Sequence, residues 1–338
     1  MTGFAVWRQQ TWIWPAVASL ILLALIFALS EELKFGIITA NLAAASFLAL
    51  VGIGQMFPVA TGEGGIDLSI PFVMNFCAFL AVRLISDNPA SVALVLLGAI
   101  AFSALVGIVN GTVVVWIRVP PIIGTLAVGF VILTFVQIIA ASGSTTIANR
   151  SVVDIVRGSF AGIPTPAYVV LVIGIVANIV IGRTPYGRAL LAVGQSRRAA
   201  YLAGMDVSRT ILIAYVVSAV LAGLTGVLLA ASVGSADLEL GNPFLLTSVG
   251  AVVLGGNRIA GGMASVVGTT FGALLLTLLV VAVTVAGFPI EVKHIASGIV
   301  ITTVLVAANA SEGPPRRRRF AIIPFRGRLW KKGGSDGG

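Results

Sequence analysis

Charged residues are scarce in this chain of 338 residues. Only 10% of its residues are charged, whereas 58% are hydrophobic and the mean hydropathy is +1.08. Soluble domains carry about 25% charged residues, so this composition excludes a water-soluble fold. The sequence predicts an all-α polytopic membrane protein.

Cysteine and histidine each occur once, as Cys77 and His294. A single cysteine cannot form a disulfide within the chain or supply a cysteine metal cluster. The sequence also lacks a Ser/His/Asp arrangement and the phosphate-binding pattern G-x-x-x-x-G-K-[ST]. We therefore expect no catalytic, metal or ATP site in this chain, and a protein that is not an enzyme.

Long apolar runs are the main feature that the sequence does contain. Because about 20 apolar residues span a bilayer, the chain is predicted to have about ten transmembrane segments. They are residues 12–30, 36–57, 65–84, 90–117, 121–141, 166–182, 211–233, 243–254, 264–286 and 294–308. The predicted transmembrane domain covers residues 1–310. Residues 311–338 form a basic tail that we expect to be disordered and to lie against anionic lipid.

The net charge of +9 would suggest a nucleic-acid partner in a soluble protein. Here the positive charges sort by side of the membrane instead. If the N-terminus lies inside, ten spans place 16 of the 21 basic residues inside, eight of them in the tail. Without the tail, eight inside still outnumber five outside. The positive-inside rule therefore predicts that both termini are cytoplasmic, and we expect no nucleic acid to bind.

Two short motifs indicate an internal repeat. Residues 67–72 (DLSIPF) resemble residues 239–244 (ELGNPF), with an acid, a Leu and a Pro-Phe pair at the same spacing. On the ten-span topology an odd number of segments separates them, so the two halves would have inverted orientations. Transporters often contain such repeats, and interrupted helices at matching positions point to the transport path.

A polar cluster, residues 61–75, lies at the start of the third segment, and its glycines allow non-helical backbone. Non-helical backbone at membrane depth is tolerated only where it is buried in protein or lines a cavity. We expect Asp67 or Ser69 to cap the helix that begins near Pro71, with direct substrate contact as the alternative role for Asp67. The candidates for a translocation pathway are Asp67, Ser69, Asn75, Asn41 and Asn110.

The spans contain few ionisable side chains beyond Glu63 and Asp67. Ion-coupled carriers need buried ionisable residues along their path. The neutral polar residues therefore favour an uncharged, hydroxyl-rich solute and an energy source outside this chain. The alternative is an ion-coupled secondary carrier with Asp67 or Glu63 as its ion site.

Segment 184–210 is the longest polar interruption among the predicted cytoplasmic connections. Ser196 is expected to cap a helix of about two turns, and Gly204 to end it in the left-handed conformation. Asp206 or Ser208 would cap the next span. A small-residue face is formed by Ala199, Ala200 and Ala203. Such a face buries little apolar area and anchors poorly in lipid, so we expect a protein partner to pack against it.

Three motifs carry a resemblance to a known family: GGIDLS (residues 64–69), YGRALLAVGQSRRAAYLAGMDV (186–207) and AVVLGGNRIAGGMASVVGT (251–269). Together with the ten-span layout, they make the chain similar to the permease subunits of bacterial ABC sugar importers of the ribose type, which have branched-chain amino acid relatives. The chain departs from the family pattern at Pro71, where the family continues GGIDLSVGS, and at Glu63, a charge within the glycine run.

The resemblance implies a type II ABC importer fold of about ten helices in two inverted repeats, working in the bacterial inner membrane as a dimer of identical or related permeases. It implies a separate ATPase subunit that binds ATP and Mg, and a solute-binding protein that delivers the solute from outside. The implied ATPase-coupling residues are Gly194, Ser196, Arg197, Arg198, Ala199, Ala200 and Gly204. The favoured solute is a monosaccharide or polyol, with branched-chain amino acids or nucleosides as alternatives.

Overall fold

The computed structural model describes residues 12–29, 35–141, 143–147 and 149–287, with a few isolated positions between 295 and 303. Its helices are α2 (Ile13–Leu29), α3 (Phe35–Ala60), α4 (Ile70–Leu84), α5 (Ala90–Val115), α6 (Pro121–Ala140), α7 (Arg150–Arg157), α8 (Thr165–Arg183), α9 (Pro185–Gln195), α10 (Arg197–Leu202), α11 (Val207–Val233), α12 (Phe244–Leu254) and α13 (Val266–Val285). Two short strands, β1 (Ser159–Phe160) and β2 (Ile163–Pro164), pair antiparallel.

Six of the described helices are long and apolar enough to cross a membrane. They are α3, α5, α6, α8, α11 and α13, and the shorter apolar helices are α2, α4 and α12. These helices confirm a polytopic, mostly helical membrane protein. The count of about ten spans and the inverted repeat stay predictions. The basic tail lies outside the described residues, and so does the tenth predicted segment apart from a few isolated positions.

Proline marks where several of these helices begin. It occupies the first or second position of α4, α6, α8 and α9. Its fixed φ suits the first turn of a helix, and its missing N–H would have had no intrahelical partner there. The start of α4 at Ile70 therefore agrees with the predicted interruption before Pro71.

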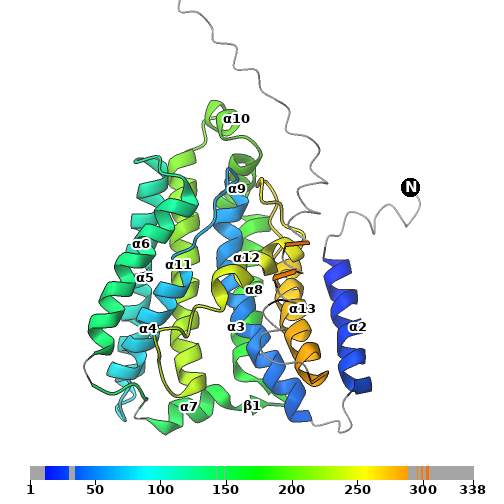
Figure 1. Ribbon diagram of the computed structural model, residues 1–338. Coiled ribbons are helices and arrows are strands. Elements are labelled where there is room, and N and C mark those ends of the chain that lie inside the picture. Colours follow the sequence, from blue (N-terminus) through cyan, green and yellow to red (C-terminus); the bar gives the residue numbers. More distant parts are fainter. Residues whose placement is uncertain are drawn as a thin grey trace, which may run out of the picture.

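Helices α3 and α11 form the centre of the bundle (Figure 1). The apolar window of α3 is 83% buried, against 22% for α8. On one side, α4, α5, α6 and α7 share an apolar core with α11. On the other, α3, α8, α12 and α13 share a second core, and α2 packs on α13. The inner faces of α3, α4 and α11 are therefore well protected from solvent.

Small residues allow α5 and α11 to approach each other closely. Gly107 and Gly111 lie one turn apart on α5, and a side chain at either would collide with the α11 backbone, at Val216 and at Leu212. Helices in lipid associate through packing rather than through hydrophobic burial, so small residues four apart favour such contacts. The α5–α11 seam is thus a backbone-to-backbone contact.

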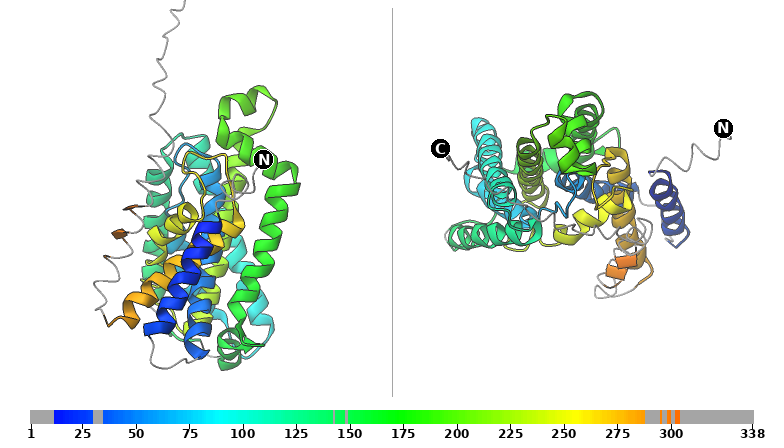
Figure 2. Two further views of the ribbon diagram at one scale, coloured as in Figure 1. Left: turned by 90° about the vertical axis from the view of Figure 1, so that its right-hand side faces the viewer. Right: turned by 90° about the horizontal axis from the view of Figure 1, so that it is seen from above.

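The two ends of the bundle carry different elements. Figure 1 shows α9 and α10 at one end and α7 with the β1–β2 hairpin at the opposite end. Figure 2 shows α10 extending beyond the ends of the neighbouring helices. We refer to these as the α10 end and the α7 end.

Candidate functional site

The predicted short helix is present at the α10 end. The Ser196 hydroxyl oxygen caps it by accepting from the Ala199 N–H at 3.3 Å. Gly204 has a left-handed φ of +81° and follows the end of the helix. Asp206 then caps α11 by accepting from the Arg209 N–H at 2.9 Å. Both caps follow from local sequence alone.

A second helix, α9, lies immediately before α10 and was not predicted. The Thr184 hydroxyl oxygen caps it by accepting from the Gly187 N–H at 3.1 Å, and Pro185 follows at its first position. The Thr-Pro pair is the sequence signal that could have revealed this helix. Gly194 belongs to the last turn of α9, so the predicted coupling element 194–204 comprises the end of α9, a capped turn and α10.

Helix α9 is held firmly against the bundle. Leu190 and Val193 are fully buried, and the Tyr186 ring stacks on Phe57 at the end of α3, with ring centroids 6.5 Å apart. Burial raises the pKa of the Tyr186 phenol, so the side chain stays neutral at physiological pH. A displacement of α9 would therefore act directly on the end of α3.

The prediction that three alanines form one outward face was wrong. Ala200 is only 3% exposed and packs into a cluster with Val114, Val193, Ile211 and Tyr215. Consecutive helical residues point about 100° apart, and on this short helix Ala200 is the one turned inward while Ala199 and Ala203 are exposed. The one inward side chain anchors the helix.

The outward surface of α10 is larger and more apolar than predicted. Tyr201 is 72% exposed and Leu202 is 75% exposed, beside the exposed Arg198 and Ala199. We call these four residues the α10 face. Sequence reasoning missed Tyr201 and Leu202, because a helix of six residues is too short for its pattern to show which side is buried.

Arg197 does not belong to the α10 face. Its Nη1 lies 2.9 Å from Glu63 Oε2, and its Nη2 donates to the Gly62 carbonyl at 3.4 Å. Arg197 therefore turns back to the linker between α3 and α4, whereas its neighbour Arg198 is exposed.

Four glycines form a junction where three segments meet: Gly62, Gly194, Gly261 and Gly262. A side chain at Gly194 would collide with the backbone of Ala60 and of Gly262, and one at Gly62 would collide with the Ala260 carbonyl. The Gly262 N–H donates to the Ala60 carbonyl at 3.0 Å. This glycine junction joins the end of α3, the end of α9 and the loop between α12 and α13.

The loop between α12 and α13 is fixed by one buried amide. The Asn257 Nδ2 donates to the Val252 carbonyl at 2.7 Å and to Thr269 Oγ1 at 2.9 Å, and its Oδ1 accepts from the Ser265 N–H at 2.6 Å. This geometry gives the motif 251–269 a structural role. Its asparagine fixes the conformation of the loop, and its glycines Gly261 and Gly262 pack closely against the neighbouring segments.

Asp67 lies at the centre of a polar network in the α3–α4 linker. Its Oδ1 accepts from the Ser69 N–H at 3.0 Å and from the Ser69 hydroxyl at 2.6 Å. Its Oδ2 accepts from the Ser218 hydroxyl of α11 at 2.9 Å. The Asn110 side chain of α5 donates to Ser69 Oγ at 2.8 Å. Asp67 is 1% exposed, so its side-chain oxygens find their hydrogen-bond donors within the chain rather than in solvent.

The prediction that Asp67 or Ser69 caps the helix by its side chain was wrong. Ser69 occupies the N-cap position of α4 but makes no side-chain cap hydrogen bond. Asp67 instead accepts from the N–H of Ser69, outside the helix. The linker is also tied to α6, because the Leu68 N–H donates to Thr125 Oγ1 at 2.9 Å. Tertiary hydrogen bonds replaced the local cap.

The structure brings together only some of the predicted pathway residues. Asp67, Ser69 and Asn110 share the network, whereas Asn75 is fully buried elsewhere on α4. The Asn75 side chain donates to the Leu238 carbonyl and accepts from the Gly241 N–H, both at 2.7 Å. Asn41 lies 19 residues before the end of α3, about 28 Å along the helix. Most of these side chains therefore support the bundle from inside one chain.

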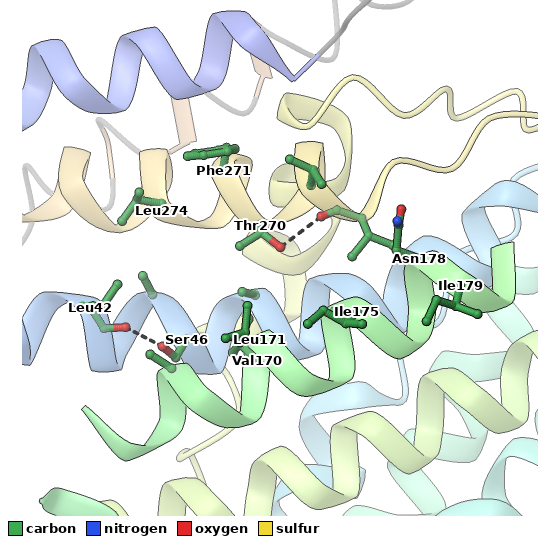
Figure 3. A pocket seen from close by; sticks show the side chains of 16 residues that line it. Leu42, Ser46, Val170, Leu171, Ile175, Asn178, Ile179, Thr270, Phe271 and Leu274 are labelled. Carbon is green, nitrogen blue, oxygen red and sulfur yellow. Dashed lines mark hydrogen bonds between the residues drawn. The ribbon is translucent and has the colours of Figure 1, made fainter. Parts of the chain in front are cut away.

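Two cavities flank these elements. One, of about 420 Å³, opens between α3, α8 and α13 (Figure 3). Its walls are largely aliphatic, and the hydroxyls of Ser46 and Thr270 bond to their own helices, so it suits lipid chains better than a hydroxyl-rich solute. The other, of about 470 Å³, lies at the α10 end and is bordered by Glu63, Arg118 and Arg197.

Comparison with known proteins gives a consistent result. Residues 37–306 match the family described as "Branched-chain amino acid transport system / permease component". The chain is 27% identical over 312 residues to the "Autoinducer 2 import system permease protein LsrD" of Yersinia pestis (strain Pestoides F), covering 90% of this chain and 93% of the relative. The protein of the same name from Yersinia pseudotuberculosis serotype O:1b (strain IP 31758) shows the same identity and coverage. No solved structure matches.

Proposed function

We propose an import function from one premise: the chain belongs to the permease-component family of branched-chain amino acid transport systems. It is the transmembrane permease of an ATP-binding-cassette importer. We propose that it moves a small neutral solute of the monosaccharide or polyol class inward. This solute class is supported by relatives named for autoinducer 2 import and by the scarcity of ionisable side chains in the spans.

The observation that carries the proposal is the α10 face. It presents Tyr201 and Leu202 to solvent on a capped helix that extends beyond the bundle. Burying a Leu side chain is worth about 1.5–3 kcal/mol, and because α10 extends beyond the ends of the neighbouring helices, this surface favours a protein partner over lipid. Because the sequence contains no phosphate-binding loop, we propose that the partner is an ATPase subunit, which binds ATP and Mg and receives α10 in a groove.

The remaining assignments complete the proposal. The α10 end is cytoplasmic, both termini lie on that side, and about ten spans cross the bacterial inner membrane as two inverted repeats within residues 1–310. The basic tail, residues 311–338, contacts anionic lipid. A second permease, identical or related, completes the pore, and a solute-binding protein loads it at the α7 end. Phe160 and Ile155, 77% and 66% exposed there, support a contact surface at that end.

An ion-coupled carrier is the competing function, and Asp67 would be its ion site. The carboxylate oxygens already accept hydrogen bonds from Ser69 and Ser218. A carboxylate satisfied by its own chain is a poor site for a coupling ion. Uptake that survives loss of cellular ATP but stops when the ion gradients collapse would establish this alternative.

The test is Leu202→Glu in the full importer, with Leu202→Met as the matched control. The charged side chain should abolish uptake and co-purification of the ATPase subunit while leaving membrane insertion intact, because Leu202 makes no contribution to the core. The methionine variant should retain both. Normal uptake by Leu202→Glu would refute the docking assignment.

A further inference from the structure

We propose that Arg197 and Glu63 form the link through which movement of α10 reaches the α3–α4 linker. The inference rests on the proposed function, because it assumes that an ATPase subunit moves α10. It assigns to one ion pair the task of positioning the linker during transport.

The contact is a two-point contact between segments far apart in sequence. Arg197 is the first residue of α10, and its guanidinium reaches two consecutive residues of the linker. Nη1 pairs with Glu63 Oε2 at 2.9 Å, and Nη2 donates to the Gly62 carbonyl at 3.4 Å. The planar guanidinium fixes direction as well as distance, so a rotation or shift of α10 moves both linker residues.

The exposure of the pair argues against a purely structural role. The Glu63 side chain is 67% exposed and that of Arg197 is 25% exposed. Ion pairs this close to solvent add little to folding stability. The Nε of Arg197 has no hydrogen-bond partner among the described residues, so the guanidinium is held on its linker side. The adjoining cavity of about 470 Å³ leaves space for the pair to open.

The backbone conformation of Glu63 is one that favours glycine, which indicates that its side chain has a role at this position. Its φ is +55°, between Gly62 at +73° and Gly64 at +72°. Residues other than glycine are uncommon in this region, and such a conformation persists where the surroundings impose it. A glycine at position 63 would adopt this φ without strain. The chain instead carries a carboxylate there, and that carboxylate contacts Arg197.

The linker can pass the movement onward to several helices. Asp67 lies four residues after Glu63 and bonds to Ser218 of α11. Ser69 accepts from Asn110 of α5, and Thr125 of α6 accepts from the Leu68 N–H. A displacement at Glu63 therefore acts on hydrogen bonds to α5, α6 and α11, at the centre of the bundle.

The experiment uses the complete importer reconstituted in liposomes, and measures solute taken up per ATP hydrolysed. Glu63→Asn removes the charge but tolerates the left-handed backbone. Arg197→Glu reverses the partner. Both variants should still bind the ATPase subunit, while coupling should fall about tenfold, within the 5–150-fold range usual for coupled sites. The charge-swapped double variant, Glu63→Arg with Arg197→Glu, should recover most of the loss.

Arg198→Glu is the matched control, because Arg198 is the exposed neighbour on the α10 face. It should weaken ATPase binding instead, and Glu63→Arg should not rescue it. Single variants with full coupling, or a folded double variant no better than the singles, would overturn the inference. If the complex assembles and transports but the variants give these overturning results, only the Arg197–Glu63 inference fails and the proposed function stands. If the wild-type complex contains no ATPase, both the inference and the proposed function fail.

Discussion

Gly194→Ala is the sharpest test of the glycine junction. The added methyl group would meet the Ala60 carbonyl and the backbone of Gly262. No flexible side chain lies there to move aside, so the end of α9 must separate from α3 and from the loop between α12 and α13. That separation also strains the 3.0 Å hydrogen bond from the Gly262 N–H to the Ala60 carbonyl.

The expected loss of stability combines two destabilising effects and one stabilising effect. Forcing a methyl group into a packed site costs about 1–3 kcal/mol, and losing the backbone hydrogen bond adds about 1 kcal/mol. Replacing glycine by alanine within α9 returns up to about 1 kcal/mol of helix propensity. The net expectation is a loss of about 1–3 kcal/mol in the free energy of unfolding, or a Tm lower by about 2–6 °C at about 2 °C per kcal/mol.

Gly182→Ala is the control, because Gly182 is also helical and a methyl group there would meet nothing within 4 Å. Thermal unfolding in detergent should show Gly194→Ala well below wild type and Gly182→Ala at or slightly above it. Uptake should fall only in the Gly194 variant, since the junction lies between α3 and the coupling element. Equal Tm values for the two variants would refute the close-packing argument.

Two further outcomes are expected. Ala200→Glu should lower Tm and membrane yield rather than ATPase binding alone, because it buries a charge beside Tyr215; a well-folded variant would show that α10 is not anchored through Ala200. In a Cys77→Ser background, cysteines at Ser144 and Ala203 should react with impermeant maleimide from outside and inside the cell respectively, because Ser144 lies in a segment that bonds to Gly234 at the end of α11, whereas Ala203 lies just before the start of α11. Labelling of both from one side would contradict the proposed topology.

Local signals predicted much of the candidate site. The caps at Ser196 and Asp206 and the left-handed Gly204 each depend on residues within a few positions, so the sequence sufficed to place α10. The hydrophobic runs likewise coincide with the described apolar helices. The Thr184 cap of α9 was equally local, and it was missed because the segment was read as a single connection.

Tertiary contacts defeated the other predictions. Asp67 was expected to cap its own helix, but besides its bonds from Ser69 it accepts from Ser218, which is 151 residues away. The inward side of α10 depends on where Val114 and Ile211 lie, which no periodicity in six residues can reveal. The ion pair between Arg197 and Glu63 joins α10 to a glycine-rich linker that belongs to a different sequence motif. Sequence located the polar groups but not their partners.

The contact between α4 and the loop after α11 bears on how the two halves of the chain could have diverged. The Asn75 side chain donates to the Leu238 carbonyl and accepts from the Gly241 N–H. A side chain at Gly241 would collide with the backbone of Pro71. The matching segments DLSIPF and ELGNPF therefore touch each other. If they descend from one duplicated ancestor, this contact was once between identical segments, and the substitutions that now distinguish them had to arise while each was packed against the other.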